Sequence, residues 1–335
     1  MRQRVGGRFS LIIMLLSCLW LSFACSKASH VPDNAIVVRD QLGRTVALPQ
    51  AAKRIVSLSP AATESLFHIG CGDRIVLRDN WSDYPIQSKA IASIDGFSPS
   101  AELILAARPD LVVAHFPTAA LQAALNSAGV PWIALAPATL ADVSASLATL
   151  GLLCGHAEDG RRAAATFAAR QAAIESALQG ATKPRVFYEM DGGDGSRPFT
   201  VGRGSFGHQL VEHGGGINVF GQRSEPWLQV GLEAIRAADP QLWLLADADS
   251  ADRPQSPATV AARPGFGAIA AVRDGKFASL PADLAARPGP RLILGLAAAA
   301  KAIHPDRAAA IDAAPQAATA AQPLDVAPAA ARGSQ

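Results

Sequence analysis

The sequence predicts an α/β protein built as two lobes joined by one long helix. Short apolar stretches alternate with helical stretches over residues 36–153, and the alternation restarts over residues 183–304. This order is typical of parallel sheets that are covered by helices on both faces. Residues 156–180, between the two lobes, contain no proline and predict a helix roughly 36 Å long at about 1.5 Å per residue.

A helix-then-strand unit occurs once in each predicted lobe. "AELILAARPDLVVA" at residues 101–114 matches "LEAIRAADPQLWLLA" at residues 232–246 with a constant offset. The offset aligns Glu102 with Glu233 and Pro109 with Pro240. The repetition indicates that the two lobes are similar in design.

The N-terminal lobe is expected to begin with a hairpin around "QLGR", since apolar and polar residues alternate on both sides of it. A strand at Ile55–Leu58 and a helix from near Ala62 to the glycines around Cys71 come next. The remaining strands and helices are expected, in order, in the segments "DRIVLRD", "AELILAA", "LVVAHF", "LQAALNSAGV", "PWIALA" and "LADVSASLATLG".

The C-terminal lobe is expected to repeat this plan. Its strands and helices are expected, in order, in "RVFYEM", the segment after "GRGS", "INVF", the segment from Glu233, "LWLLAD", the stretch from Val260 to Ala271, "FASLP" and "RLILGLAAAAKAI". Residues 305–335 are rich in Ala, Pro and Gln and carry few large apolar side chains. A segment of that composition predicts a disordered tail.

Residues 1–24 have the pattern of a secretory signal peptide. Arg2, Arg4 and Arg8 precede a 14-residue apolar run, which is shorter than the roughly 20 residues that a spanning helix needs. "LSFAC" resembles a lipoprotein cleavage box and favours lipidation of Cys25. Lipidation at Cys18 in "LLSC" and plain cleavage after Ala24 are the alternatives. We therefore expect export to the periplasm, with a lipid anchor at Cys25.

Charge and cysteine content narrow the class of protein further. Without residues 1–24 the chain is nearly neutral and has no basic stripe, which argues against nucleic acid as a partner. The remaining cysteines, Cys71 and Cys154, either pair in an oxidising compartment or stay as two buried thiols, and their spacing does not decide between these states.

No group of residues in the sequence predicts catalysis. Ser59 follows a strand, but "SLSPA" lacks the nucleophile elbow of a hydrolase, and we expect this serine to cap the next helix. The seven histidines show no spacing typical of metal ligands. The sequence therefore predicts a protein that is not an enzyme and has no cofactor of its own.

Several aromatic side chains instead lie at strand ends or in loops of a chain that is only 6% aromatic. Ligands of open parallel sheets bind at the carboxyl ends of the strands, and loop aromatics are favourable where a ligand covers them. The pattern predicts a cleft for a large, flat, partly apolar ligand. Its candidate lining residues are Ser59, Pro60, Ala61, Trp81, Phe97, His115, Phe116 and Trp227.

The chain resembles the solute-binding proteins of bacterial ABC importers for cobalamin, haem and ferric siderophores. The resemblance covers about residues 36–303 and is carried by "RIVSLSPAATESLFHIGCGDRIV", "SDYP", the repeated glutamate-to-proline unit, "FTVGRGSFGHQLVEHGGGINVF", "PWLQV" and "RPGPRLIL". It implies the class III periplasmic binding protein fold, in which one backbone helix bridges two Rossmann-like lobes. It also implies a monomer that delivers its ligand to the importer's permease subunits.

Within this family the chain is most similar to the cobalamin-binding proteins, so that the implied ligand is cobalamin or another corrinoid. Trp81 before "SDYP", Trp227 in "PW", and the Asp283 and Arg287 pair match that group residue by residue. The strand-end aromatic of that group is replaced by His115, which is followed by Phe116. A histidine can ligate iron or cobalt, so haem or a ferric siderophore is the alternative ligand, with Tyr84 and Tyr188 as other candidate axial ligands.

The resemblance also gives the paired glutamates a role. In this family an acidic residue on each lobe docks onto arginines of the permease, and Glu102 and Glu233 match those two positions. The alternative is that each carboxylate only stabilises the positive end of its own helix.

Overall fold

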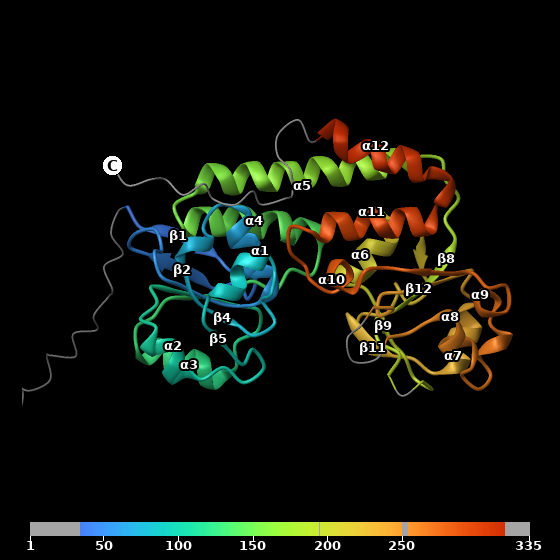
Figure 1. Cartoon of the computed structure of the whole chain (residues 1–335), viewed down its shortest axis with the longest axis horizontal. Coiled ribbons are helices and arrows are strands. Elements are labelled where there is room, and N and C mark those ends of the chain that lie inside the picture. Colours follow the sequence, from blue (N-terminus) through green and yellow to red (C-terminus); the bar gives the residue numbers. More distant parts are fainter. Residues whose placement is uncertain (1–33, 194, 250–253, 319–335) are drawn as a thin grey trace, which may run out of the picture.

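A computed structural model of the 335-residue chain describes residues 34–193, 195–249 and 254–318. Two α/β lobes lie side by side, and helix α5 (Ala157–Ala177) runs across the top of both (Figure 1). The predicted two-lobe fold with one long bridging helix is therefore confirmed. The predicted signal peptide and Cys25 lie outside the described residues.

The N-terminal lobe contains a five-stranded parallel sheet with the order β5-β4-β3-β6-β7. The antiparallel hairpin of β1 and β2 precedes it. The strands are β1 (Ile36–Arg39), β2 (Thr45–Leu48), β3 (Ile55–Leu58), β4 (Ile75–Asp79), β5 (Ser93–Ile94), β6 (Leu111–Ala114) and β7 (Trp132–Ala134). The helices are α1 (Pro60–His68), α2 (Ala101–Ala106), α3 (Ala119–Ser127) and α4 (Leu140–Leu153), with short 3-10 helices η1 (Gly72–Arg74) and η2 (Ile86–Ala90).

The C-terminal lobe contains a four-stranded parallel sheet with the order β10-β8-β12-β13. A separate antiparallel pair joins β9 to β11. The strands are β8 (Arg185–Glu189), β9 (Phe199–Val201), β10 (Ile217–Asn218), β11 (Trp227–Gln229), β12 (Leu242–Leu245) and β13 (Phe277–Ser279). The helices are α6 (Phe206–His213), α7 (Leu232–Ala238), α8 (Pro257–Ala261), η3 (Phe266–Ala268), α9 (Ala270–Arg273), α10 (Ala282–Ala285) and α11 (Leu292–Ile303).

The sequence repeat extends into the centre of both sheets. Ile55 of β3 pairs with Leu111 of β6, and Val186 of β8 pairs with Leu242 of β12. Val186 follows Ile55, and Leu242 follows Leu111, by the same offset that relates Glu102 to Glu233. The register of the two central strand pairs is therefore the same. The lobes therefore share one scaffold, and equivalent positions can be compared directly.

One hydrophobic core runs through both lobes beneath α5. It includes Leu66 and Leu147 of the N-terminal lobe, Ile174 of α5, and Tyr188 and Leu296 of the C-terminal lobe. Two smaller cores fill the opposite faces of the two sheets. Because burial of apolar surface is the main stabilising term in folding, the shared core makes the two lobes one folded unit.

The prediction of a disordered segment from residue 305 is wrong for residues 305–318. Pro305–Arg307 form the 3-10 helix η4 and Ala308–Ala318 form α12, which packs against α5 and α11. Ile311 is fully buried. Alanine has the highest helix propensity and its small side chain lets helices approach closely, so that few large side chains are needed. Residues 319–335 lie outside the described part of the chain.

The prediction of one continuous helix from Val260 to Ala271 is also wrong, since this stretch forms α8, η3 and α9 in succession. Pro264 and Gly265 interrupt it, and Gly265 has a φ of 82°, a left-handed conformation that ends a helix and that glycine adopts without strain.

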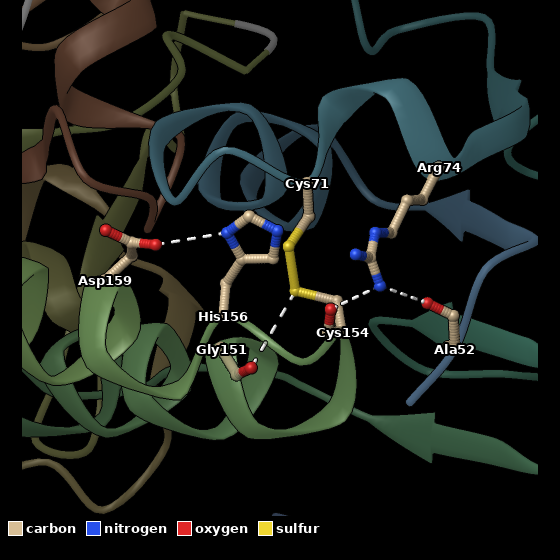
Figure 2. Close-up of a disulfide and its surroundings, with 7 residues drawn as sticks. All are labelled: Ala52, Cys71, Arg74, Gly151, Cys154, His156 and Asp159. Atoms are coloured by element: carbon tan, nitrogen blue, oxygen red, sulfur yellow. Dashed lines mark hydrogen bonds and ion pairs between the residues drawn. A yellow bond between two sulfur atoms is a disulfide. The ribbon is translucent and has the colours of Figure 1, made fainter. Parts of the chain in front are cut away.

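A disulfide joins Cys71, which follows α1, to Cys154, which follows α4 (Figure 2). Their Cα atoms are 6.5 Å apart. Arg74 donates from the same nitrogen to the carbonyl oxygens of Cys154 and Ala52. Of the two states that the sequence left open, the structure has the disulfide, which ties the ends of two helices of the N-terminal lobe together.

Candidate functional site

A cleft opens at the carboxyl edge of the N-terminal sheet, facing the C-terminal lobe. Its volume is about 300 Å³. The lining residues are Leu58, Ser59, Pro60, Ala61, Asp79, Trp81, Gly96, Phe97, His115, Ala286, Arg287 and Pro288. An adjoining hollow shares Phe97 and His115 and adds Phe116. Eight of the ten residues predicted to contact ligand thus line this continuous surface.

Two aromatic side chains form one wall of the cleft. Trp81 is 52% exposed and Phe97 is 81% exposed, and their rings meet edge to face with centroids 5.9 Å apart. A Cβ atom on Gly96 would lie 3.0 Å from the Asp79 side chain, so that glycine lets the Phe97 loop approach. Such exposed rings bury a large apolar area when a ligand covers them.

Asp79 fixes the turn that carries Trp81. This side chain is 2% exposed, and its carboxylate accepts hydrogen bonds from the Trp81 amide at 2.9 Å and from the Ser82 hydroxyl. The Thr63 hydroxyl in turn lies 2.9 Å from the Ser82 hydroxyl oxygen. Burial raises the pKa of Asp79, and the Ser82 hydrogen bond opposes this shift. This buried network positions the aromatic wall.

The floor of the cleft is the amino end of α1. Ser59 is at the N-cap position, but its side chain makes no capping hydrogen bond, so the expected capping role is wrong. Pro60 occupies the first helical turn, where its missing amide hydrogen costs nothing. The free amino-terminal end of α1 therefore faces the space that a ligand would occupy.

His115 lies where the cleft meets the adjoining hollow. Burial lowers its pKa, which favours the neutral imidazole that ligates metals. Its ring meets Phe116 edge to face at 4.4 Å. Tyr188 does not reach the cleft, because it is 1% exposed and its hydroxyl donates to the Ala285 carbonyl at 3.2 Å. The suggestion of Tyr188 as an axial ligand is therefore wrong.

Arg287 reaches into the cleft from the C-terminal lobe and is held from both lobes. Its guanidinium lies 2.6 Å from Asp83 of the N-terminal lobe and 3.1 Å from Asp283, which is one helical turn away. The Arg287 hydrogen bond lowers the pKa of Asp83, against an opposing contribution from burial. The predicted pairing of Asp283 with Arg287 is confirmed, whereas Asp83 was missed.

A second ion pair also joins the two lobes. Glu64 of α1 is 4% exposed and accepts hydrogen bonds from the backbone amide of Arg291 at 2.9 Å and from its guanidinium at 3.0 Å. The same guanidinium stacks on the Tyr84 ring, 3.5 Å from its centroid. Burial raises the pKa of Glu64, and the charge of Arg291 partly offsets this shift. Tyr84 is thus engaged as a stacking partner.

Trp227 lies on the C-terminal lobe, outside the residues that line the cleft. It is 42% exposed on β11 and its ring meets Phe206 edge to face at 5.2 Å. The three-residue strands β9 and β11 form the pair that presents it.

The paired glutamates lie at matching places on the two lobes. Glu102 is exposed in the first turn of α2, and Glu233 is exposed in the first turn of α7. Both helices lie at the ends of their lobes that are farthest from α5 (Figure 1). The Glu233 carboxylate lies 3.4 Å from Arg236.

The lining of the cleft supplies apolar surface together with hydrogen-bonding side chains. Over residues 34–193, 195–249 and 254–318, no three His, Cys, Asp or Glu side chains come together as a metal site. Within the same residues, no helix is both long and apolar enough to cross a membrane. The cleft combines exposed aromatic rings with an arginine, which together suit a flat ligand that carries polar groups at its rim.

A family model described as "Periplasmic binding protein" matches residues 55–284. The chain belongs to the periplasmic binding protein family. Curated relatives of this periplasmic binding protein include the vitamin B12-binding proteins of Pectobacterium carotovorum and Salmonella typhimurium. The first is 33% identical over 202 residues, covering 58% of this chain and 70% of the relative. The second is 34% identical over 200 residues, covering 58% and 73%.

Solved structures show the same fold. The periplasmic vitamin B12-binding protein BtuF of Vibrio cholerae matches with a TM-score of 0.64 and 24% identity, covering 78% of this chain and 98% of that one. The apo form of the periplasmic heme-binding protein RhuT from Roseiflexus sp. RS-1 matches with a TM-score of 0.67 and 26% identity, covering 77% and 100%. The class III fold inferred from the sequence is confirmed.

Proposed function

We propose that this periplasmic binding protein is the substrate-binding component of an ABC importer and that it captures cobalamin or a related corrinoid. The observation that carries the proposal is the cleft between the lobes, in which Trp81, Phe97 and Arg287 occupy one continuous surface. The similarity to curated vitamin B12-binding proteins supports it. In this role the protein binds and delivers its ligand and performs no chemical conversion.

Each part of the cleft has a task in this proposal. The rings of Trp81 and Phe97 cover apolar faces of the corrin, while the Arg287 guanidinium donates hydrogen bonds to amide oxygens at its rim. Arg287 is already held by Asp83 and Asp283, so little side-chain entropy is lost on binding. In this proposal Trp227 and Asp283, which lie outside the cleft lining, add weaker contacts from the C-terminal lobe.

Tryptophan emission tests the proposal directly, since Trp81 lies in the cleft. Titration of the purified mature protein with cyanocobalamin should quench the emission until the site is saturated. Replacement of Arg287 by Ala should weaken binding about tenfold, as the loss of charge-assisted hydrogen bonds worth about 1.5 kcal/mol implies. The absence of saturable quenching up to about 50 µM, where a site with a Kd of about 1 µM is nearly full, would contradict the proposal.

Haem is the second candidate ligand, because His115 adjoins the cleft and burial lowers its pKa. If haem is the ligand, haemin should give a Soret shift that is lost in the His115→Ala variant. A cobalamin receptor should instead keep its affinity for cyanocobalamin within about fivefold in that variant, because the ring edge at the cleft margin contributes less than about 1 kcal/mol.

Delivery involves the permease, and we propose that Glu102 and Glu233 dock onto its basic residues. Both carboxylates are exposed at matching positions on the two lobes, and complementary charge guides such encounters. Reversal of both charges, Glu102→Lys with Glu233→Lys, should abolish uptake and leave cobalamin affinity intact. Unchanged uptake would rule out this docking role.

Export by the signal peptide in residues 1–24 and lipid anchoring at Cys25 complete the proposal. Fractionation of cells that produce the full chain should find the protein with membranes, and Cys25→Ser should release it to the soluble fraction. A soluble wild-type protein would point to plain cleavage after Ala24.

A further inference from the structure

The two helices that carry Glu102 and Glu233 are short, and each ends in the same way. Helix α2 has six residues and α7 has seven. Arg108 and Asp239, which follow them, have φ values of 48° and 43°, and each precedes a proline. Isolated helices of this length are not stable in water, so contacts with the rest of each lobe must hold the two helices in place.

One such contact is an arginine from the central strand region of each lobe. The Arg54 guanidinium donates to the carbonyl oxygens of Arg108 at 3.0 Å and Ala107 at 2.7 Å, at the carboxyl end of α2. The Arg185 guanidinium donates to the carbonyl oxygen of Asp239 at 2.8 Å, at the carboxyl end of α7. Arg54 and Arg185 are related by the same offset as the two glutamates.

The backbone of each arginine is itself fixed to the strand that follows the helix. The amide of Arg54 donates to Asp110 at 3.0 Å, and the amide of Asp110 donates back to the Arg54 carbonyl at 2.9 Å. Arg185 and Gln241 exchange the equivalent pair of hydrogen bonds, at 2.9 Å and 2.8 Å. Each arginine thus links the carboxyl end of a short helix to the central sheet of its lobe.

The charge of the arginines suits this place. The last carbonyl groups of a helix lack partners within the helix and carry the negative end of its dipole, so a cation that bonds them is stabilising. A second anchor of each helix is a fully buried isoleucine, Ile104 in α2 and Ile235 in α7. The buried isoleucine holds the helix against the core of its lobe, and the arginine holds the carboxyl end of the helix against the central sheet.

We propose that Arg54 and Arg185 are positioning residues for permease docking, which hold α2 and α7 so that Glu102 and Glu233 present a fixed spacing and orientation. This inference rests on the proposed docking role of the two glutamates. The partner that it fits is a rigid surface with two basic patches, one for each lobe, since only such a surface gains from a fixed spacing. The pre-organised geometry lowers the entropic cost of docking.

The two anchors differ in strength. Arg185 also lies 2.7 Å from the Asp239 carboxylate, whereas the equivalent residue of the N-terminal lobe is Arg108, which has no carboxylate to offer Arg54. Arg54 donates to two carbonyl oxygens at the end of α2, whereas Arg185 donates to one at the end of α7. Because loss of Arg54 leaves two helix-end carbonyl groups without their donor, it should disturb α2 more than loss of Arg185 disturbs α7.

The test compares Arg54→Ala, Arg185→Ala and the double alanine variant with the conservative variant Arg54→Lys with Arg185→Lys, which is called the double lysine variant here. Arg161→Ala is the matched control, since Arg161 is an exposed arginine on α5 whose ion pair with Glu158 lies away from both helices. The first measurement is hydrogen exchange of the full mature chain, which requires no ligand. The amides of residues 103–108 and 234–239 should exchange faster in the alanine variants, most of all in the Arg54→Ala variant at 103–108, and elsewhere exchange should be unchanged.

The second measurement is uptake of radiolabelled cyanocobalamin by proteoliposomes that contain the importer, as a function of the concentration of loaded binding protein. The double alanine variant should raise the apparent KM about tenfold with the maximal rate and the cyanocobalamin affinity unchanged, and the double lysine variant should restore part of the loss. A merely structural role would lower the amount of folded protein without this change in KM.

Two results would overturn the proposal: unchanged exchange in the two helices, or faster exchange with an unchanged KM. A Glu102→Gln with Glu233→Gln variant in the same assay separates this failure from failure of the docking role. If that variant transports normally, docking through the glutamates is wrong; if it fails while the double alanine variant transports normally, only the positioning role of the arginines is wrong.

Discussion

The two lobes are alike at the ends that carry α2 and α7 and differ at the strand ends that face each other. Leu58 at the end of β3 lines the cleft, whereas Glu189 at the equivalent end of β8 is fully buried. Phe116 is 68% exposed after β6, whereas Asp247, at the equivalent position after β12, is 5% exposed. The same scaffold thus leaves its sheet edge open in one lobe and filled in the other.

Charged side chains occupy the ends of the strands in the C-terminal lobe. Glu189 accepts hydrogen bonds from both terminal nitrogens of Arg263, at 2.8 Å and 2.6 Å, and from the Trp243 indole at 3.1 Å. A buried bidentate ion pair of this kind occupies space and satisfies its own polar groups. The N-terminal edge instead offers exposed aromatic rings. The difference supports the proposal that the N-terminal lobe supplies the apolar platform for ligand and the C-terminal lobe supplies Arg287 and a rigid wall.

The largest expected effect is the loss of the disulfide, which only the N-terminal lobe possesses among the described residues. Replacement of Cys71 and Cys154 by serine frees a segment of 83 residues and should lower the free energy of unfolding by about 4 kcal/mol through the larger entropy of the unfolded chain. Urea denaturation of the mature protein measures this. A loss below about 1 kcal/mol would show that the core beneath α5 holds the lobe without the disulfide.

The Glu189→Gln variant tests the structural role of the C-terminal edge. The unfolding free energy should fall by about 3 kcal/mol, because Arg263 is left as a buried, uncompensated charge, while cyanocobalamin affinity should stay within about twofold. Thermal and urea denaturation give the first quantity. Glu158→Gln, which breaks an exposed ion pair on α5, is the control and should cost under about 1 kcal/mol. A large loss of affinity at constant stability would place ligand at this edge.

The Trp81→Ala variant tests the binding role of the N-terminal edge and should have the opposite profile. Affinity for cyanocobalamin should fall about thirtyfold, or about 2 kcal/mol, while stability changes by less than about 1 kcal/mol. Leu42→Ala, which removes an exposed side chain in the loop after β1, is the control. Trp227→Ala should reduce affinity less, since Trp227 does not line the cleft. Calorimetric titration of each variant provides the comparison. Equal affinities of the Trp81→Ala variant and the wild type would show that Trp81 does not contact the ligand.

The smallest expected effect concerns the pH dependence of the C-terminal edge. Burial, reinforced by the charge of Glu189, raises the pKa of Asp247 to about 7 from an ordinary value of 3.8. Because the folded state then holds the proton more tightly than the unfolded state, the contribution of Asp247 to stability falls as the pH rises from about 4 to about 7. Asp247→Asn should remove this slope, so that the variant gains stability relative to the wild type at pH 8 and not at pH 4. Melting curves of both proteins across this range check it; parallel curves would contradict it.

The sequence alone was sufficient for the scaffold and for most of the N-terminal side of the cleft. Strand–helix alternation and the repeat that aligns Glu102 with Glu233 predict two similar lobes, and strand-end positions predict that Trp81, Phe97 and His115 lie together. These inferences depend on local patterns, which one sequence displays.

What the sequence did not reveal depends on contacts between distant residues. Asp83 lies 204 residues before Arg287 and Glu64 lies 227 residues before Arg291, so neither ion pair between the lobes has a local signal, although "SDYP" marked the neighbourhood of Asp83. Strands β9 and β11 have three residues each, too few for a periodic pattern. Helix α12 has few large apolar side chains and forms because alanine has a high helix propensity, which a count of apolar residues does not show.

The most direct test of the account is isothermal titration of the purified mature protein with cyanocobalamin and, in parallel, with haemin. Capture of a corrinoid in the cleft between the lobes predicts one cyanocobalamin bound per chain with a Kd of about 1 µM or tighter, and haemin binding at least about a hundredfold weaker. Haemin binding tighter than cyanocobalamin, or no heat of binding with cyanocobalamin, would contradict it.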